Sequence, residues 1–318
     1  MNVVTPIPRV SEPPALIRVG TVGAFVLTFR RPVELVDAIG GVLAQSRGLD
    51  SVTILNCDTS EPLKQRLRPR FPGVDVVDLD ANVGSAGGFD RALRLAYERR
   101  LEWAWLFDDD CVPAPDALSE LLRGAAGAAG GRVGIVAPVQ VTQRQVYGVS
   151  FWRDRLVRPR LRRTDPPLDV DVAYWAGMLV NRRVLEEIGF PRPEFFRCFG
   201  DYEFCLRARK AGFRVLAVPT SHVVHDHGPP NVVVRFRRTS IRLMYPPSRF
   251  YYHVRNWAFT TRFVLRSPKA MLWHLLLQVR LAAGDLIYAD RKWERLVLRA
   301  RGVIDGFRGR LGHRKNLE

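Results

Sequence analysis

The sequence predicts an α/β fold with a doubly wound, mostly parallel sheet, followed by a basic region of amphipathic helices. Between residues 22 and 218, apolar runs of strand length alternate with amphipathic stretches of helical length, which is the pattern of a parallel sheet covered by helices. The 318 residues are 47% hydrophobic and 25% charged, a balance that suits one large α/β domain with an appendage and excludes disorder over most of the chain.

The first half of the chain carries the clearest alternation. Pro32 stands in the first turn of an expected helix, where its missing amide costs no hydrogen bond. Because ligands bind at the carboxyl ends of parallel strands, the segments after these strands are the first candidates for a site. Strands are expected over 22–28, 51–56, 74–79 and 103–107, and helices over 32–46 and 85–100.

The second half is less regular and ends in helices. Strands are expected over 132–138, 169–174 and 213–218, and helices over 182–188, 201–211, 267–289 and 291–307. Pro-rich stretches frame the α/β pattern on both sides. The predicted organisation is a Pro-rich N-terminal extension over residues 1–20, an α/β domain over 21–234 and a basic helical region over 235–318.

Cysteine usage and apolar runs bear on the compartment. Four cysteines at unequal spacings, with no CxxC pair, suggest neither a disulfide framework nor a zinc ribbon and fit a reducing setting. The N-terminus has no cationic start followed by an apolar segment, so no secretory signal is predicted. The best apolar run, residues 270–279, is expected to be too short to cross a bilayer. We therefore expect the protein on the cytoplasmic side.

The basic charge is concentrated near the C-terminus. Residues 235–318 hold 16 Arg and 3 Lys against five acidic residues, which gives +14 of the net charge of +17. Such a region, interleaved with Trp and Leu, suits nucleic acid, an acidic protein or an anionic membrane surface. A nucleic-acid-binding protein would have no use for a run of three carboxylates in the α/β domain, so no nucleic-acid partner is predicted.

That run consists of Asp108, Asp109 and Asp110, which follow directly on an expected strand. The three carboxylates would repel one another unless a cation were bound, and no basic residue adjoins them in the sequence, so a metal site is the economical interpretation. Asp108 and Asp110 can both face the ligand-binding edge, while Asp109 points away. The alternative is a solvated turn or a helix N-cap cluster.

Three further loops carry candidate binding residues. Asp58, in NCDTS after the second strand, is placed to contact a ribose or base, although an N-cap role fits it nearly as well. The Gly-rich loop 80–89 matches neither GxGxxG nor a P-loop, so its amides either hold an anionic or sugar-bearing group or form a plain turn and cap. Residues 175–177, Trp-Ala-Gly, either wall a sugar or prenyl ligand or pack in the core.

An acidic helix start and a histidine cluster complete the candidates. Asp201, in the first turn of an expected helix, is a better candidate general base than Glu203, which does not share its face. The alternative for this pair is interaction with the helix dipole. His222, His225 and His227 follow a strand, and one of them, His225 first, is expected to ligate a metal.

Taken in order, these segments resemble the inverting family 2 glycosyltransferases with the GT-A fold. The resemblance runs from about residue 22 to 228 and rests on FVLTFRRP, NCDTS, NVGSAGGF, FDDDC, AGMLVNRRVLEEIG, FGDYEFCLRARKAG and VVHDHG. Within that family the chain is most similar to the galactofuranosyltransferases of actinobacterial cell-wall galactan, and especially to the initiating type. NVGSAGGF, DDD and YYHVRNWAF also occur in related rhamnosyltransferases, so the reaction type is better fixed than the donor sugar.

The resemblance implies a role for each candidate residue. Asp201 would be the catalytic base and would act alone, because Gly200 stands where the family has an acidic residue. A divalent cation, Mn²⁺ or Mg²⁺, would be held on the donor diphosphate by Asp108, Asp110 and His225. The nucleotide-sugar site would be lined by Thr28, Arg30, Asp58, Asn82, Gly84 and Asp109, and toward the acceptor by Trp175, Ala176 and Gly177.

The implied reaction moves galactofuranose from UDP-galactofuranose to a polyprenyl-diphosphate-linked GlcNAc-rhamnose acceptor, which initiates cell-wall galactan. The alternative is a rhamnosyltransferase or another nucleotide-sugar transferase of the same fold. A donor panel would separate the two.

A lipid-linked acceptor gives the basic helices an expected role, which is peripheral attachment to the anionic cytoplasmic face of the plasma membrane. The alternative is that these helices pack on the catalytic domain or on a second copy of the chain in a homo-oligomer. In the membrane interpretation, lipid would be faced by Leu272, Trp273, Leu276, Val279 and Leu286. Basic residues near the headgroups would include Lys269, Arg280, Arg291, Lys292, Arg295 and Arg299.

Overall fold

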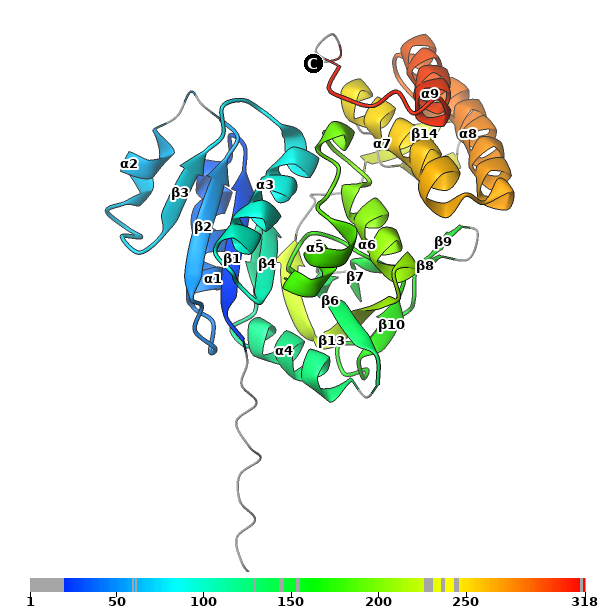
Figure 1. The fold of residues 1–318 in the computed structure, drawn as a ribbon. Helices are drawn as coiled ribbons and strands as arrows, with labels where there is room; N and C mark the ends of the chain where they lie inside the picture. Colours follow the sequence, from blue (N-terminus) through cyan, green and yellow to red (C-terminus); the bar gives the residue numbers. More distant parts are fainter. Residues whose placement is uncertain are drawn as a thin grey trace, which may run out of the picture.

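A mixed sheet forms the centre of the molecule (Figure 1). The computed structural model describes residues 20–58, 60, 62–128, 130–142, 146–152, 155–225, 231–235, 238–242, 246–314 and 317. The strands of the central sheet are β1 (Val22–Thr28), β2 (Ser51–Asn56), β3 (Asp75–Asp78), β4 (Trp103–Asp108), β5 (Cys111–Pro113), β6 (Arg132–Val141), β7 (Val146–Tyr147), β10 (Leu168–Val170), β12 (Met178–Asn181) and β13 (Phe213–His225).

The strand order is β10-β13-β6-β12-β4-β1-β2-β3, with β5 paired to β13 and β7 paired to β6. Strands β1 to β4 are mutually parallel, and so are β6 and β13. Strand β12 runs antiparallel between β4 and β6 and joins these two parallel blocks. The expected α/β fold with a mostly parallel sheet is therefore confirmed.

Helices cover both faces of the sheet and bury one apolar cluster on each. Helices α3 (Gly84–Glu98), α5 (Arg182–Ile188) and α6 (Gly200–Lys210) lie on one face, where Phe89 and Phe204 are fully buried. The other face is covered by α1 (Pro32–Leu43), α2 (Leu63–Leu67) and α4 (Ala117–Gly127). Two-sided burial explains why the strands read as continuous apolar runs rather than alternating ones.

Strand β13 is longer than predicted, and this matters for the site. The predicted strand ends at Val218 because Pro219 follows, but the strand continues to His225 through a register shift between Val218 and His222. A bulge accommodates a proline, which cannot donate a ladder hydrogen bond. The continuation pairs His225 with Cys111 of β5 and so brings the histidine to the acidic run.

Two smaller sheets and a helical region complete the described chain. The first small sheet contains β8 (Val149–Trp152), β9 (Leu156–Val157) and β11 (Val172–Ala173), and the second contains β14 (Asn231–Arg235) and β15 (Arg238–Arg242). The helical region contains α7 (Pro247–Phe259), the π-helical turn η2 (Thr260–Leu265), α8 (Pro268–Tyr288) and α9 (Lys292–Phe307). The proposed domain boundary at residues 234 and 235 falls within β14, and residues 1–19 of the Pro-rich extension lie outside the described chain.

Helices α7 and α9 pack closely because α9 carries glycine where the two backbones meet. A Cβ at Gly306 would lie 2.2 Å from the carbonyl oxygen of Arg255, so any side chain there would push the helices apart. Figure 1 shows α7, α8 and α9 stacked beside the end of the sheet domain that carries α6.

Candidate active site

Polar side chains gather where β1, β2 and β4 end. Asp109 turns back toward β1, where its carboxylate accepts hydrogen bonds from the Thr28 hydroxyl at 2.9 Å and from the Phe29 amide at 3.2 Å. Asp109 thus links the ends of β4 and β1.

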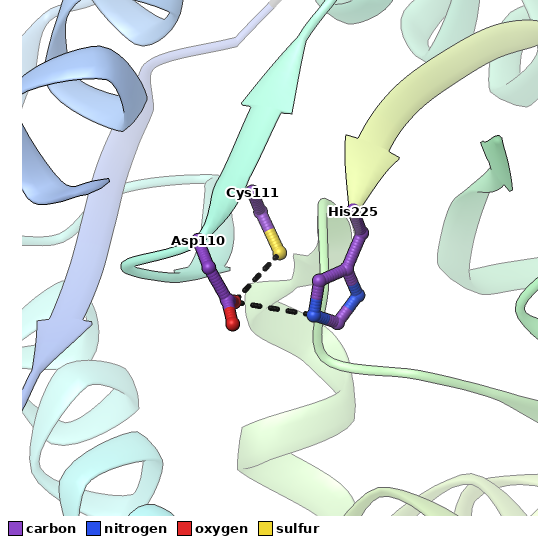
Figure 2. A group of neighbouring side chains, drawn as sticks. All are labelled: Asp110, Cys111 and His225. Carbon is purple, nitrogen blue, oxygen red and sulfur yellow. Dashed lines mark hydrogen bonds and ion pairs between the residues drawn. The ribbon is translucent and has the colours of Figure 1, made fainter. Parts of the chain in front are cut away.

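Asp110 and His225 face each other across the site (Figure 2). The Nε2 atom of His225 lies 3.1 Å from Oδ1 of Asp110, and Nδ1 lies 3.0 Å from Oε1 of the buried Gln140. If Nδ1 carries the proton and donates it to Gln140, the lone pair of Nε2 faces a carboxylate oxygen. Two acceptors at this distance require a cation between them, either a proton or a metal ion. The pair therefore fits a metal site, with Gln140 orienting the imidazole.

The neighbouring Cys111 and Asp108 differ in their suitability as ligands. Donor atoms of Asp110, Cys111 and His225 all lie within 4.8 Å of one another, and Asp108 is not in this group. Burial raises the pKa of the Cys111 thiol well above its usual range, so it stays protonated and is a poor ligand. Asp108 lies close enough for its charge to act on its neighbours, and burial raises its pKa to about 6.

The structure also provides a basic neighbour that the sequence did not predict. Arg31, just after β1, forms ion pairs with Asp110 and, at 3.5 Å, with Asp109. Burial alone would raise the pKa of Asp110, but the hydrogen bond and charge of His225, and then Arg31, hold it well below its usual range. No basic residue is next to the acidic run in the sequence, but the fold brings Arg31 beside it. The expectation that the run has no basic neighbour was therefore wrong. Arg31 offsets only one of three carboxylate charges, so the site still suits a divalent cation.

The remaining donor-side candidates lie at the same edge and are largely engaged with the protein. Arg30 pairs with Asp58 at 3.2 Å, but its side chain is 67% exposed, so the pair adds little stability. The amide and hydroxyl of Ser60, followed by Arg30, lower the pKa of Asp58. Asp58 itself is buried, so Arg30 is the residue of this pair that is open to a ligand.

The Gly-rich loop has a structural explanation. The Asn82 side chain accepts a hydrogen bond from the Gly84 amide at 3.0 Å, which forms a tight turn at the start of α3. Gly84 has φ of +67°, and a Cβ there would lie 2.0 Å from the carbonyl oxygen of Phe196. Asn82 and Gly84 thus shape the contact between α3 and the segment before α6, which is the plain-turn alternative of the sequence analysis.

Asp201 lies at the start of α6 and carries the strongest sign of a general base. It keeps part of its surface open to solvent but is surrounded by protein on most sides, and this burial raises its pKa to about 7. The Tyr202 amide donates to its carboxylate at 2.9 Å and opposes that shift, whereas the charge of Asp108 adds to it. Asp201 and Asp108 therefore share one site.

Glu203 is excluded as the base by its surroundings. Its fully buried carboxylate accepts hydrogen bonds from Arg192 and Arg207, each at 2.9 Å. Two arginines hold this carboxylate in place through charge-assisted hydrogen bonds. The second carboxylate of this helix start is structural.

Residues 175–177 belong mainly to the core. Trp175 is buried and stacks on Phe89 with ring centroids 5.0 Å apart, and Ala176 is buried as well. Gly177 has φ of +82°, donates to the Leu106 carbonyl and accepts from the Trp105 indole. The Trp175 backbone amide acts on Asp201, and the indole Nε1 of Trp175 lies beside Gly200, the residue before Asp201. Of the other histidines, His222 is not part of the metal-binding group, and His227 lies outside the described residues.

The segment that leads to Asp201 is held by two residues that the sequence analysis missed. Phe196, Cys198 and Phe199 all have φ between 62° and 68°, a conformation that is costly for non-glycine residues. Asn256 of α7 donates its side-chain amide to the carbonyls of residues 195, 197 and 198 at 2.9 to 3.0 Å. Arg255, fully buried, donates to the carbonyls of residues 194, 195 and 312.

This arrangement predicts a large loss of stability on substitution of Arg255. Arg255→Met removes four hydrogen bonds, three of them to carbonyls, and should lower the free energy of unfolding by roughly 3 kcal/mol. Denaturant titration measures this as a lower midpoint at unchanged slope. The exposed Arg308→Met is the matched control and should change stability by less than about 0.5 kcal/mol. We call the hydrogen bonds of Arg255 and Asn256 to the segment before Asp201 the clamp. A loss of unfolding free energy below about 1 kcal/mol in Arg255→Met would contradict its structural role.

The chain is similar in sequence to a glycosyltransferase family and to two curated galactofuranosyltransferases. A family model described as "Glycosyltransferase like family 2" matches residues 20–245. Galactofuranosyltransferase GlfT1 of Mycobacterium tuberculosis is 26% identical over 200 residues, which are 60% of this chain and 66% of that protein. Galactofuranosyltransferase GlfT2 of Mycolicibacterium smegmatis is 22% identical over 231 residues, 62% of this chain and 36% of that protein. The chain thus matches just under two thirds of GlfT1.

Solved structures with a similar fold include two enzymes crystallised with Mn²⁺. The mannosyltransferase PcManGT from Pyrobaculum calidifontis, in complex with GDP-Man and Mn²⁺, gives a TM-score of 0.53 at 14% identity and covers 90% of this chain and 87% of its own. GalNAc-T7 with UDP, GalNAc and Mn²⁺ gives 0.54 at 16% identity and covers 66% and 44%. At such low identity these likenesses concern the fold alone.

Proposed function

The chain belongs to the glycosyltransferase-like family 2 and has the GT-A fold, and from this premise we propose that it transfers galactofuranose from UDP-galactofuranose to a polyprenyl-diphosphate-linked GlcNAc-rhamnose acceptor. The galactofuranosyltransferase relatives support the choice of donor. The observation that carries the reaction type is the half-buried Asp201, with its raised pKa, beside the acidic run that faces His225.

The proposed mechanism is a single displacement with inversion. Asp201 accepts the proton of the acceptor hydroxyl while that oxygen attacks the anomeric carbon of the donor sugar. The bond from the anomeric carbon to the diphosphate breaks with its electron pair, and UDP departs. Asp110 and His225, with Asp108 beside them, would hold Mn²⁺ or Mg²⁺, which when bound offsets the negative charge that grows on the departing diphosphate.

A donor panel tests the proposed function. Purified full-length protein is incubated with a lipid-linked GlcNAc-rhamnose acceptor and UDP-galactofuranose, dTDP-rhamnose or UDP-glucose, and the products are identified by mass. The proposal expects the hexose product from UDP-galactofuranose alone. A deoxyhexose product from dTDP-rhamnose would instead identify a rhamnosyltransferase, which keeps the mechanism and changes the donor.

We further propose that the helical region attaches the enzyme to the cytoplasmic face of the membrane, where such an acceptor lies. Helix α8 leaves Leu272, Leu276 and Val279 more than half exposed, and Trp293 of α9 is 78% exposed. An apolar surface of this kind beside exposed basic side chains is typical of interfacial helices. Lys269, Arg280 and Arg291 are exposed, as the membrane interpretation expects.

Two expectations about this region need correction. Arg295 and Arg299 are buried, and Arg299 forms an ion pair with Asp285 and donates to Gln278, so neither arginine is available to headgroups. Helix α8 has 21 residues and, within the described chain, is long and apolar enough by length and composition to cross a membrane, contrary to the expectation of a short apolar run. Its buried His274, Gln278 and Asp285 face the protein, which favours a helix lying along the surface.

Binding to vesicles should depend on the negative charge of the lipid and on the exposed apolar face of α8. Each basic residue near an anionic surface contributes about 1 kcal/mol, so co-sedimentation should rise with phosphatidylglycerol content and fall with salt. Leu276→Ser with Val279→Ser should weaken binding roughly tenfold or more, because both exposed side chains lose their burial in lipid. Leu43→Ser, equally apolar and 48% exposed on α1, is the control and should bind like the wild type. Equal binding to neutral vesicles would rule out the docking role.

A further inference from the structure

A cavity of about 330 Å³ lies beside the candidate active site, on the side away from β1 and β2. Its lining includes the aromatic Tyr147, the apolar Val146, Val149 and Leu161, and two arginines, Arg158 and Arg160. A volume of this size is at the lower end of the range for small-molecule sites. None of these residues was a candidate in the sequence analysis.

Hydrogen bonds connect the cavity wall to the proposed metal ligand His225 and to the segment that carries the proposed base Asp201. The Tyr147 hydroxyl donates to the backbone carbonyl of His225 at 2.7 Å. The wall of the cavity therefore contacts the backbone of the proposed metal ligand itself. On the other side, Tyr174 donates its amide to the Gly148 carbonyl, and its hydroxyl bonds that of Tyr202 at 2.9 Å. Tyr202 is the neighbour of Asp201. The cavity therefore adjoins the place where an acceptor meets the base.

The two arginines are not neutralised by the protein. Within the described chain, Arg158 and Arg160 make no hydrogen bond or ion pair, and both are exposed. The charge of Arg158 reaches the Tyr202 hydroxyl, where it opposes the burial that raises the pKa of Tyr202. The segment from Arg155 to Arg163 holds five arginines, with Asp154 just before it and Asp165 two residues after it, so positive charge predominates along it. Guanidinium groups of this kind suit phosphate oxygens, which they can bind in a bidentate manner.

We propose that this cavity binds the diphosphate of the lipid-linked acceptor. The inference rests on the proposed function, which makes the acceptor a diphosphate. A diphosphate is also present in the donor, but the proposed function already assigns that diphosphate to the metal site at Asp110 and His225, whereas the cavity lies beyond His225 at β7, on the side of the sheet away from Thr28 and Asp58. Position in the sheet therefore favours the acceptor.

The surroundings of the arginine segment agree with a lipid-linked ligand. Arg155 lies over the ring of Trp273 at 5.5 Å, which connects the segment to α8. Leu156 and Trp152 pack in the same apolar cluster as Leu277 of that helix. A ligand whose diphosphate occupies the cavity can thus extend its apolar chain toward the exposed face of α8.

Direct binding tests the cavity independently of transfer. Calorimetry with farnesyl diphosphate as the probe, in the presence of saturating UDP to fill the donor site, should show binding to the wild type. Arg158→Gln with Arg160→Gln should weaken it roughly tenfold or more, since each charge-assisted contact is among the stronger hydrogen bonds. Arg162→Gln with Arg163→Gln removes the same two charges from the same segment outside the cavity and should bind like the wild type. Absent binding to the wild type, or equal loss in the control, would overturn the proposal.

Kinetics separate the acceptor from the donor. The double variant should lose at least tenfold in its preference for the diphosphate-linked acceptor over a neutral alkyl glycoside of the same disaccharide, with the KM for the donor unchanged. A raised KM for the donor would assign the cavity to the donor diphosphate and overturn the proposal. This test compares two acceptors for one enzyme, whereas the donor panel compares three donors. If the proposed function is wrong, UDP-galactofuranose gives no product in the panel, and that outcome can be told apart from a failure of the cavity proposal.

Discussion

Asp201→Asn should lower the transfer rate by roughly 10²- to 10⁴-fold while donor binding stays near that of the wild type. The amide keeps the size and much of the hydrogen bonding of the carboxylate but cannot accept the proton of the acceptor hydroxyl. The rate comes from product formation at saturating substrates, and donor binding comes from UDP titration. Asp116 is exposed and its side chain makes no hydrogen bond to the described residues, so Asp116→Asn is the matched control and should behave like the wild type.

The pH dependence identifies the same group. A base whose pKa is about 7 is protonated and inactive below that pH, so kcat/KM should rise with pH, about tenfold per unit below pH 6, and level off above pH 7. A cation bound beside Asp108 would remove part of the charge that raises this pKa, which shifts the limb toward lower pH. In Asp201→Asn, this rise of kcat/KM with pH should be absent. Near-wild-type turnover in Asp201→Asn would place the base elsewhere, though not at Glu203, which two arginines hold.

Removal of the metal should have an effect of comparable size. Stabilisation of a leaving diphosphate by a divalent cation is worth several kcal/mol, so excess EDTA should lower the rate by roughly 10²-fold or more, and Mn²⁺ or Mg²⁺ should restore it. Product formation with and without added metal measures this directly. Full activity in excess chelator would show that Arg31 and His225 alone neutralise the acidic run.

Single substitutions assign the ligands. Asp110→Asn should raise the Mn²⁺ concentration needed for half-maximal activity at least tenfold, because it removes the carboxylate that faces His225. Cys111→Ala is the informative comparison, since Cys111 lies in the same group but its thiol stays protonated. A similar loss in Cys111→Ala would make the thiol a ligand and contradict the assignment to Asp110 and His225.

The sheet was predictable because its strands are buried on both faces, so each appears as a short apolar run that ends at a polar residue. Thr28, Asp58 and Asp108 could be placed at one edge from strand direction alone. The end of β13 could not, because Pro219 reads as a stop and only the pairing with β6 and β5 continues the strand to His225.

The residues that support the site were less accessible to sequence reasoning. Arg31, Gln140 and Asn256 act through contacts between segments distant in the chain, and no local spacing encodes them. One signal was available. Arg255 and Asn256 form a polar pair inside the apolar, aromatic stretch YYHVRNWAF, and such a pair in a buried helix must find partners elsewhere. The Gly-rich loop could not be decided from the sequence, since the same glycines suit a binding loop and a tight turn, and the structure shows Gly84 packed closely on Phe196.

The clamp on the segment before Asp201 has a consequence for the order in which the molecule forms. Arg255 follows Phe195 by 60 residues and also holds Gly312, which lies 57 residues farther on. During synthesis from the N-terminus, the strands and helices of the sheet domain are complete before either residue exists. The strained backbone at Phe196, Cys198 and Phe199 gains the hydrogen bonds of Arg255 and Asn256 only after these late residues have been synthesised, so we expect the proposed base to be fixed in place late. Under the proposed function, the proposed base and the proposed membrane-docking surface would therefore be completed at the same stage of synthesis.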